Sequence, residues 1–166
     1  MAIHSPSTST RTHTVDESST VTRRVRGETR CIANDRIFDA SGKMTPDFCP
    51  DTFKGEGKAG KMWTTKLGWI ARHMTLLQVK VWRDIPKLRK AAMVARLEDK
   101  FKWNEPDPHK KNANILDSID RQLNKSWKEW RCRMHTYFIL LGGQTDPEEA
   151  KKHKHKQVMV QADWDW

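Results

Sequence analysis

The stretch ILDSIDRQLNKSWKEWRCRMHTYFILL, residues 115–141, decides the fold class of this chain. Its apolar residues recur three or four positions apart, so at about 100° per residue they all lie on one side of a helix. This apolar stripe consists of Ile115, Ile119, Leu123, Trp127, Trp130, Met134, Tyr137 and Leu141. Gly142 and Gly143 follow and predict the end of the helix. Such a helix would be roughly 40 Å long, so we expect it to extend beyond its neighbours.

Two shorter helices are predicted before the long one. The first has its apolar face on Trp63, Leu67, Ile70 and Met74. The second should begin with Asp84 as its N-cap and Pro86 in its first turn, and it should end before Pro106. Its apolar positions are Leu88, Ala92, Met93, Ala95, Leu97 and Phe101. The chain is therefore predicted to be mainly α, with a basic three-helix domain over residues 63–141 whose last helix is the longest.

The N-terminal residues are predicted to form little regular structure. Residues 1–24 are rich in Ser, Thr and Arg and poor in apolar residues, so we expect a disordered tail. Residues 25–62 are interpreted as an irregular arm with short strands around residues 36–38 and 43–48. This arm would lead into the first helix of the domain.

Residues 55–60, GEGKAG, match the G-x-G-x-x-G pattern of dinucleotide-binding turns. That pattern requires a hydrophobic strand before it and a βαβ unit around it. Pro50 interrupts the preceding residues, and no such unit follows. We therefore interpret the segment as a flexible connector.

The C-terminal residues 142–166 are predicted to be a tail of mixed charge, disordered apart from a short helix at residues 146–150. The last four residues are DWDW. Trp164 and Trp166 at the very end suggest a chain that is cut inside a longer pattern.

The positive charge is concentrated in the middle of the chain. The whole sequence has 31 Lys and Arg against 21 Asp and Glu, a formal net charge of +10. Residues 60–141 hold 18 of these cations against 8 acids, and six of the eight tryptophans. A basic, aromatic-rich segment indicates a polyanionic partner, most commonly nucleic acid. The alternative is that these cations only keep a small domain soluble.

Two groups of basic residues are candidate phosphate-binding sites. One lies on the long helix opposite its apolar stripe: Arg121, Lys125, Lys128 and Arg131. The other lies at the start of the second helix: Arg83, Lys87, Arg89 and Lys90. Cations at that end oppose the helix dipole, and a bound phosphate would relieve the repulsion. The alternative for the first group is an ordinary solvated face, because Asp117 and Glu129 lie near it.

Four tryptophans at apolar positions are interpreted as core residues rather than as surfaces for stacking on bases: Trp63, Trp82, Trp127 and Trp130.

Several classes of function are not indicated by the sequence. The longest apolar run, residues 137–141, is far shorter than the roughly 20 residues that cross a membrane. The three cysteines, Cys31, Cys49 and Cys132, are widely spaced, so we expect free thiols in a reducing compartment. Neither the spacing of metal ligands nor a catalytic constellation is recognisable. We therefore expect a chain without enzymatic activity, cofactor, metal or small-molecule substrate.

Four short motifs follow one another in a distinctive order: LGWIAR at 67–72, WRDIP at 82–86, LEDKF at 97–101 and WKEWRCRMH at 127–135. RVRGETR at 24–30 and GKM at 42–44 precede them. Over residues 23–166 this order resembles the plant transposase-like family associated with Ptta and En/Spm (CACTA-type) elements. Trp130 and the Gly142-Gly143 pair depart from the family pattern, which has a basic continuation at the glycines.

The resemblance implies an accessory, non-catalytic helical region of transposon origin, nuclear in setting and DNA-binding. The tryptophan-punctuated three-helix order is also analogous to Myb/SANT-like folds. Our first hypothesis is a nuclear module that binds the DNA backbone through its basic helix. The alternative is an oligomerisation helix that pairs with a second copy or with a transposase. A third reading is a transposon relic without a selected function.

Overall fold

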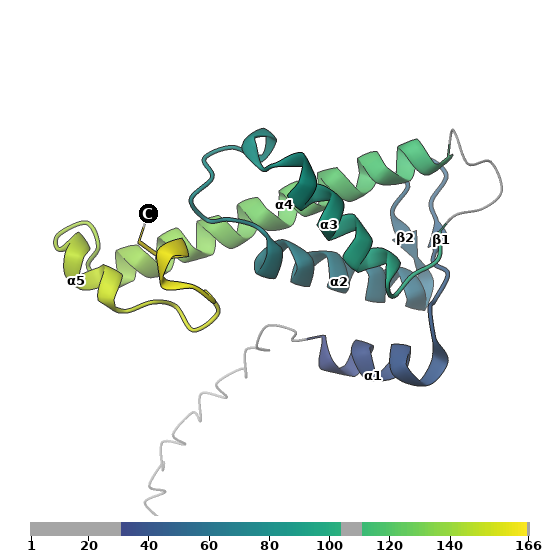
Figure 1. Ribbon diagram of the computed structural model, residues 1–166, viewed down its shortest axis with the longest axis horizontal. Coiled ribbons are helices and arrows are strands. Elements are labelled where there is room, and N and C mark those ends of the chain that lie inside the picture. Colours follow the sequence, from purple (N-terminus) through teal and green to yellow (C-terminus); the bar gives the residue numbers. More distant parts are fainter. Residues whose placement is uncertain (1–30, 104–110, 166) are drawn as a thin grey trace, which may run out of the picture.

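The computed structural model describes residues 31–103 and 111–165, and it is mainly helical (Figure 1). Two helices precede the middle of the chain: α1 (Ile32–Ser41) and α2 (Gly57–Met74). Between these two helices lie the strands β1 (Asp47–Phe48) and β2 (Gly55–Glu56). After α2 follow the 3-10 helix η1 (Trp82–Asp84), α3 (Lys87–Glu98), α4 (Lys111–Leu140), α5 (Pro147–Lys152) and the 3-10 helix η2 (Gln161–Asp163). The predicted fold class and the long helix are confirmed. The expected disordered tail at residues 1–24 lies outside the described residues.

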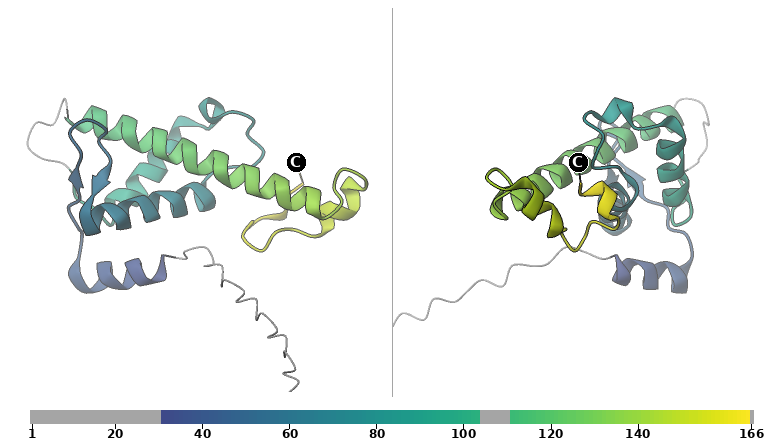
Figure 2. Two further views of the ribbon diagram at one scale, coloured as in Figure 1. Left: turned by 180° about the vertical axis from the view of Figure 1, so that it is seen from behind. Right: turned by 60° about the vertical axis from the view of Figure 1, so that its left-hand side comes forward.

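The long helix α4 packs along α2, and its C-terminal half extends beyond α2 and α3 (Figures 1 and 2). Six of the eight residues of the predicted apolar stripe are buried, from Ile115 to Met134, and Tyr137 and Leu141 are partly buried. Gly142 takes a left-handed φ of 81° and ends the helix as predicted. The stripe is thus covered within this chain.

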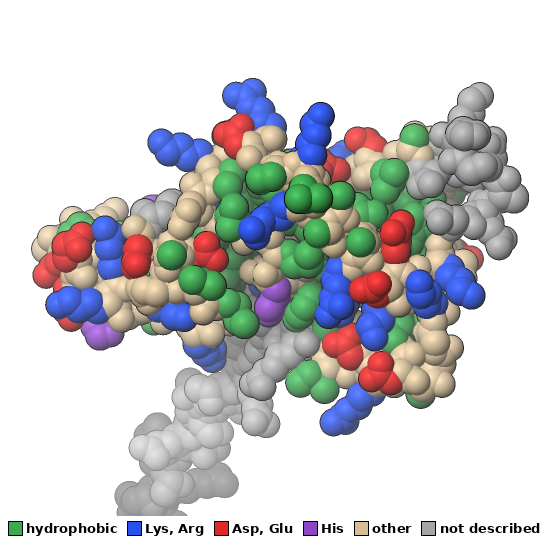
Figure 3. Space-filling model, viewed as in Figure 1, with side chains coloured by type: hydrophobic (Ala, Val, Ile, Leu, Met, Phe, Trp, Pro, Cys, Tyr) green, Lys and Arg blue, Asp and Glu red, His purple; other side chains and the backbone are tan. Residues whose placement is uncertain are grey.

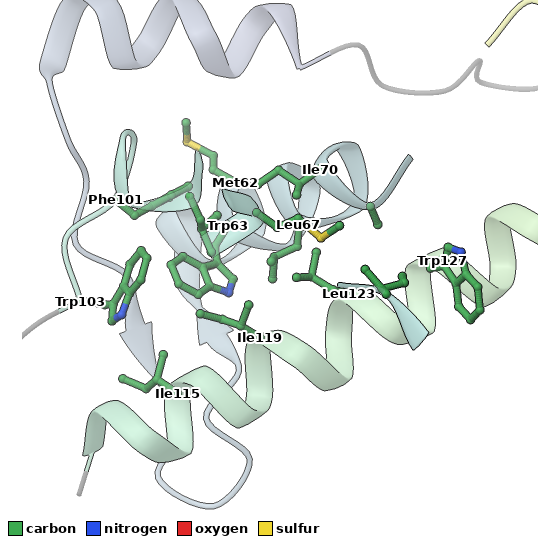
Figure 4. Close-up of a cluster of buried hydrophobic side chains, with 14 of the residues drawn as sticks. Met62, Trp63, Leu67, Ile70, Phe101, Trp103, Ile115, Ile119, Leu123 and Trp127 are labelled. Atoms are coloured by element: carbon green, nitrogen blue, oxygen red, sulfur yellow. The ribbon is translucent and has the colours of Figure 1, made fainter. Parts of the chain in front are cut away.

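The buried side chains form two clusters. The main core lies between α2, α3 and the first half of α4 (Figure 4). Trp63 is at its centre, with Phe48, Phe101 and Trp103 packed edge-on at ring-centroid distances of 5.0 to 5.2 Å. The second cluster lies under the other half of α4 and contains Leu77, Trp130, Met134, Val158 and Trp164.

The predicted strand at residues 36–38 is wrong, because these residues belong to α1. Phe38 points into the main core, and Asp35 one turn earlier pairs with Lys66 at 3.0 Å. A helix allows both contacts from one face, which the short apolar pair at residues 37–38 did not reveal. The other predicted strand is confirmed only at Asp47–Phe48, which pairs antiparallel with β2.

The interpretation of residues 55–60 as a flexible connector is also wrong. Gly55 lies in β2, and α2 begins at Gly57, whose φ is 65°. Gly60 lies in the first turns of α2, where an added Cβ would overlap the carbonyl group of Gly55. The glycines therefore allow the hairpin and the helix to pack backbone against backbone.

The second helix differs from its prediction at both ends and in its buried face. Asp84 belongs to η1, and Pro86 is the N-cap of α3, which ends at Glu98. Met93 and Leu97 are buried, whereas Leu88 is 83% exposed and Ala92 and Ala95 are exposed. The tertiary packing buries the face with Met93 and Leu97, which removes their apolar area from water and leaves Leu88 on the outer side of the helix.

The prediction of a disordered C-terminal tail is wrong for residues 144–165. The short helix α5 forms as predicted, and its N-cap Asp146 accepts a hydrogen bond of 3.0 Å from the N–H of Glu149. The chain then returns to α4, where Val158 and Trp164 are buried. We call residues 144–165 the C-terminal cover, because they shield the part of the apolar stripe that α2 does not reach.

Candidate nucleic-acid interface

Residues 80–90 are fastened along one edge of α4 at two points. The indole Nε1 of Trp82 donates to both carboxylate oxygens of Asp120, at 2.9 and 3.0 Å. At the other point, Nη1 of Arg131 donates to the carbonyl of Lys80 at 2.8 Å. These contacts bring the two predicted basic groups, which are far apart in the sequence, side by side on one surface.

Three of the eight predicted phosphate-binding residues are engaged inside the fold. Arg89 donates to the carbonyl of Met74 at 3.0 Å. Lys90 pairs with Asp120 at 3.2 Å, and its Nζ lies 4.7 Å from the Trp82 ring centroid. The third is Arg131, whose guanidinium also lies over the ring of Trp127. These side chains position the interface rather than present charge on it.

The other five predicted residues are exposed. Arg121 pairs with Asp117 at 3.4 Å, Lys125 with Glu129 at 3.9 Å and Arg83 with Asp84 at 3.8 Å. Lys87 and Lys128 have no ion-pair partner among the described residues. Exposed pairs of this kind are weak and exchange readily with solvent or a competing anion.

Lys80 joins this surface and was missed by the sequence analysis. Its side chain is exposed beside η1, while its carbonyl accepts from Arg131. The only sequence signal was its place in the basic segment just before Trp82. We call the exposed cations on this surface the basic ridge: Lys80, Arg83, Lys87, Arg121, Lys125 and Lys128. Lys and Arg side chains project at the edge of the molecule above η1 and the start of α3 (Figure 3).

The four tryptophans interpreted as core residues are all buried, at 1 to 7% exposure, which confirms that prediction. Trp127 also donates from Nε1 to the carbonyl of Leu76 at 3.2 Å. Trp82 and Trp127 therefore help to fix the segments that carry the basic ridge, and none of the four rings is available for stacking on bases.

Lys66 shows that not all of the charge surplus is on the surface. Its side chain is 2% exposed, pairs with Asp35 and has its Nζ 4.5 Å from the Trp69 ring centroid. The sequence analysis missed this residue because its position in the chain looks like any other surface lysine. A buried cation with one carboxylate partner is a structural contact between α1 and α2.

A cavity of about 800 Å³ lies beside β1, on the side of the molecule where α4 begins. Aromatic side chains and Cys49 line it, together with Lys43, Lys102 and Glu98. The hydroxyl of Thr52, followed by the backbone N–H groups of Thr52 and Asp51, lowers the pKa of the Cys49 thiol. Burial raises the pKa of the Cys31 thiol. The two cysteines therefore differ in reactivity.

We expect iodoacetamide at about pH 7 to alkylate Cys49 rapidly and to leave Cys31 unmodified in the folded chain, because only the thiolate reacts. The alkylation rate of Cys49 should decline as the thiolate becomes protonated at falling pH. Because the pKa of Cys49 is lowered, this decline should begin at a lower pH than for an ordinary thiol. Mass spectrometry of tryptic peptides measures both. The Thr52→Val variant removes the hydroxyl donor, so it should slow the alkylation of Cys49 at neutral pH. Equal rates in Thr52→Val and the parent chain would contradict this account.

Within the described parts of the chain, no group of three or more His, Cys, Asp and Glu side chains is placed to share a metal ion. No described helix is both long and apolar enough to cross a membrane. Comparisons with family models, curated proteins and solved structures found no match to this chain.

Proposed function

We propose that the chain is a non-catalytic nucleic-acid-binding module that holds the phosphate backbone with its basic ridge. The observation that carries the proposal is the fastening of residues 80–90 along α4 through Trp82, Asp120 and Arg131. It gathers cations from two sequence regions on one surface. A rigid surface of this kind suits a regularly spaced row of phosphates.

The charge balance of the ridge supports the same partner. Its six cations face three exposed acids, Asp84, Asp117 and Glu129, each in a long ion pair of 3.4 to 3.9 Å. A phosphate can displace such carboxylates at small cost, because the pairs are solvated. Binding would then release the counterions of the nucleic acid, which is the main source of backbone affinity.

The N-terminus of α3 adds a further favourable feature. Its N-cap is Pro86, which offers no side-chain hydrogen bond, and its first turn contains no acidic residue. The first N–H groups of the helix thus lack a side-chain acceptor, and Lys87 lies beside them. An anion at this point would be stabilised by these N–H groups and by the helix dipole.

The resemblance of residues 23–166 to the Ptta/En/Spm transposase-like family supports DNA as the nucleic acid, a transposon origin and a nuclear setting. A second copy or a transposase remains a further partner in this proposal.

We expect the full chain to bind a labelled random duplex at about 50 mM salt and to lose affinity steeply by about 200 mM. The ridge variant Lys80→Ala, Arg83→Ala, Lys87→Ala, Lys128→Ala should lower the slope of log affinity against log salt by about 3 to 4, because each lost phosphate contact removes about 0.9. Fluorescence anisotropy measures both quantities, and circular dichroism checks folding.

A matched control removes the same charge elsewhere: Lys43→Ala, Lys54→Ala, Lys58→Ala and Lys61→Ala, all exposed residues near the hairpin and the start of α2. This variant should keep most of the slope. Equal losses in the two variants would show that only net charge matters and would contradict the ridge. A folded parent chain that does not bind the duplex would contradict the proposed function itself.

A further inference from the structure

The C-terminal half of α4 depends on the C-terminal cover for its shielding. Trp130 and Met134 are buried in a cluster with Leu77 and with Val158 and Trp164 of the cover, and Tyr137 and Phe138 pack at its margin. Figure 2 shows this end of α4 extending past α2 with the cover folded against it. Without the cover, a row of large apolar side chains on α4 would face water.

A histidine sits at the contact between the cover and α4. The ring of His155 lies edge-on to Tyr137, with centroids 4.7 Å apart, and to Trp130, with centroids 6.0 Å apart. Its Nδ1 accepts a hydrogen bond of 3.2 Å from the backbone N–H of Gln157. An accepting Nδ1 means that the docked ring is neutral, with its proton on Nε2.

Protonation conflicts with this geometry. A proton added to Nδ1 would face the N–H of Gln157, so the hydrogen bond would be replaced by repulsion between two donors. The hydrogen bond belongs to the turn that leads to Val158, whose N–H bonds the carbonyl of His155 at 2.9 Å. The positive ring therefore disrupts the turn that places the apolar anchor of the cover.

The charges around the ring oppose protonation as well. Arg133 faces it from α4, and Lys156 follows it in the cover. Lys154 donates to the carbonyls of Val158 and Met159 in the same turn. Tyr137 is the other titratable side chain in contact with the ring. Burial, then Lys156 and then Arg133, lower the pKa of His155 below its ordinary value.

We propose that protonation of His155 releases the C-terminal cover from α4 and exposes the apolar surface of Trp130, Met134 and Tyr137. The cover is then a pH-sensitive lid on a hydrophobic helix end. This inference does not rest on nucleic-acid binding, because none of the residues that it uses belongs to the basic ridge.

The pH range follows from linkage between protonation and docking. His155 in a released cover has the ordinary pKa of about 6.5, and docking lowers it. The free energy of docking is therefore most favourable at pH values above about 6.5, where His155 is neutral in both states. As the pH falls further, the released fraction grows by up to tenfold per pH unit until the pKa of the docked ring is reached.

The experiment follows the indole N–H of Trp164 in the full chain by NMR, from about pH 7.5 to about pH 5, above the range in which carboxylates titrate. The Trp164 ring packs against Tyr137 and Phe138 of α4, with ring centroids 5.8 and 6.1 Å apart, so its indole resonance reports docking. We expect the docked resonance of the parent chain to weaken as the pH falls below 6.5. The resonances of Trp63 and Trp127, in the main core, should not change.

Two variants and one control make the result decisive. His155→Asn keeps an oxygen that can accept from the N–H two residues on but cannot titrate, so its spectrum should not depend on pH. His155→Lys carries a fixed charge and should be released at about pH 7.5. His153→Asn alters an exposed histidine, paired with Glu149 at 3.2 Å, and should behave as the parent chain does.

The proposal is overturned by any of three results. They are a parent chain whose Trp164 resonance does not change with pH, a His155→Asn variant that still titrates as the parent chain does, and a His155→Lys variant that stays docked at neutral pH.

Discussion

Replacing Trp63 with alanine should lower the free energy of unfolding by about 3 to 5 kcal/mol, enough to unfold much of a marginally stable domain. The ring is 1% exposed and contacts Phe48, Phe101 and Trp103. Its removal leaves a cavity bordered by three rings from two separate segments, β1 and the residues after α3, which cannot both move inward. Urea denaturation followed by circular dichroism measures the loss.

Trp69→Ala is the matched control on the same helix. Trp69 is only partly buried and stacks on His73 at a centroid distance of 4.3 Å, at the margin of the core. We expect its replacement to cost less than half as much, because the vacated space is open to water on one side. Comparable losses in the two variants would mean that Trp63 is not the centre of the core.

Gly60→Ala should destabilise the chain by about 2 to 3 kcal/mol, although alanine is the better helix former by about 1 kcal/mol. The added methyl group would overlap the backbone carbonyl of Gly55, which is held in β2. Backbone atoms cannot rotate away as a flexible side chain can, so the hairpin must separate from α2. Thermal and urea unfolding of the variant measure the change.

Gly68→Ala is the control for helix propensity, because it lies in the same helix. Its added methyl group would meet only Nη1 of Arg72, at 3.4 Å, the far end of a flexible side chain. We expect a gain of about 0.5 to 1 kcal/mol. The two alanines should thus have opposite effects. A gain at both positions would show that Gly55 and Gly60 are not in close contact.

Helices were predictable where the apolar residues recurred at helical spacing over many residues. The apolar stripe of α4 gave the position, the buried face and the C-terminal end correctly, because a sequence of this length admits one amphipathic face only. The second helix had two competing faces. Leu88 with the alanines was as regular a pattern as Met93 with Leu97, and only contact with α2 separated them.

Short segments were not predictable, because their conformation depends on distant partners. Residues 36–38 become helical where Phe38 reaches the core and Asp35 reaches Lys66. Residues 55–60 resemble a connector in the sequence, and only the structure shows that the backbones of Gly55 and Gly60 are in close contact. The C-terminal cover has no strong period of its own, and its order comes from the surface that α4 offers to Val158 and Trp164.

The candidate interface was predictable as a charge distribution but not as a set of side chains. The sequence indicated where the cations lie along the chain and that those on α4 oppose its apolar face. It did not indicate that Arg89, Lys90 and Arg131 have partners inside the fold, or that Lys80 joins the surface. Long basic side chains reach several neighbours, so their roles depend on which carbonyl or carboxylate is near.

By itself, the sequence determined the helical class, the long amphipathic helix, the buried tryptophans and the region that carries the positive charge. These follow from local periodicity and composition, which need no knowledge of distant contacts. The tertiary structure alone decided which cations remain exposed, which face of α3 is buried, and that residues 144–165 fold back to cover α4 with His155 at the contact. These features depend on contacts between residues far apart in the chain. Such a contact stabilises the fold only when both residues are in place.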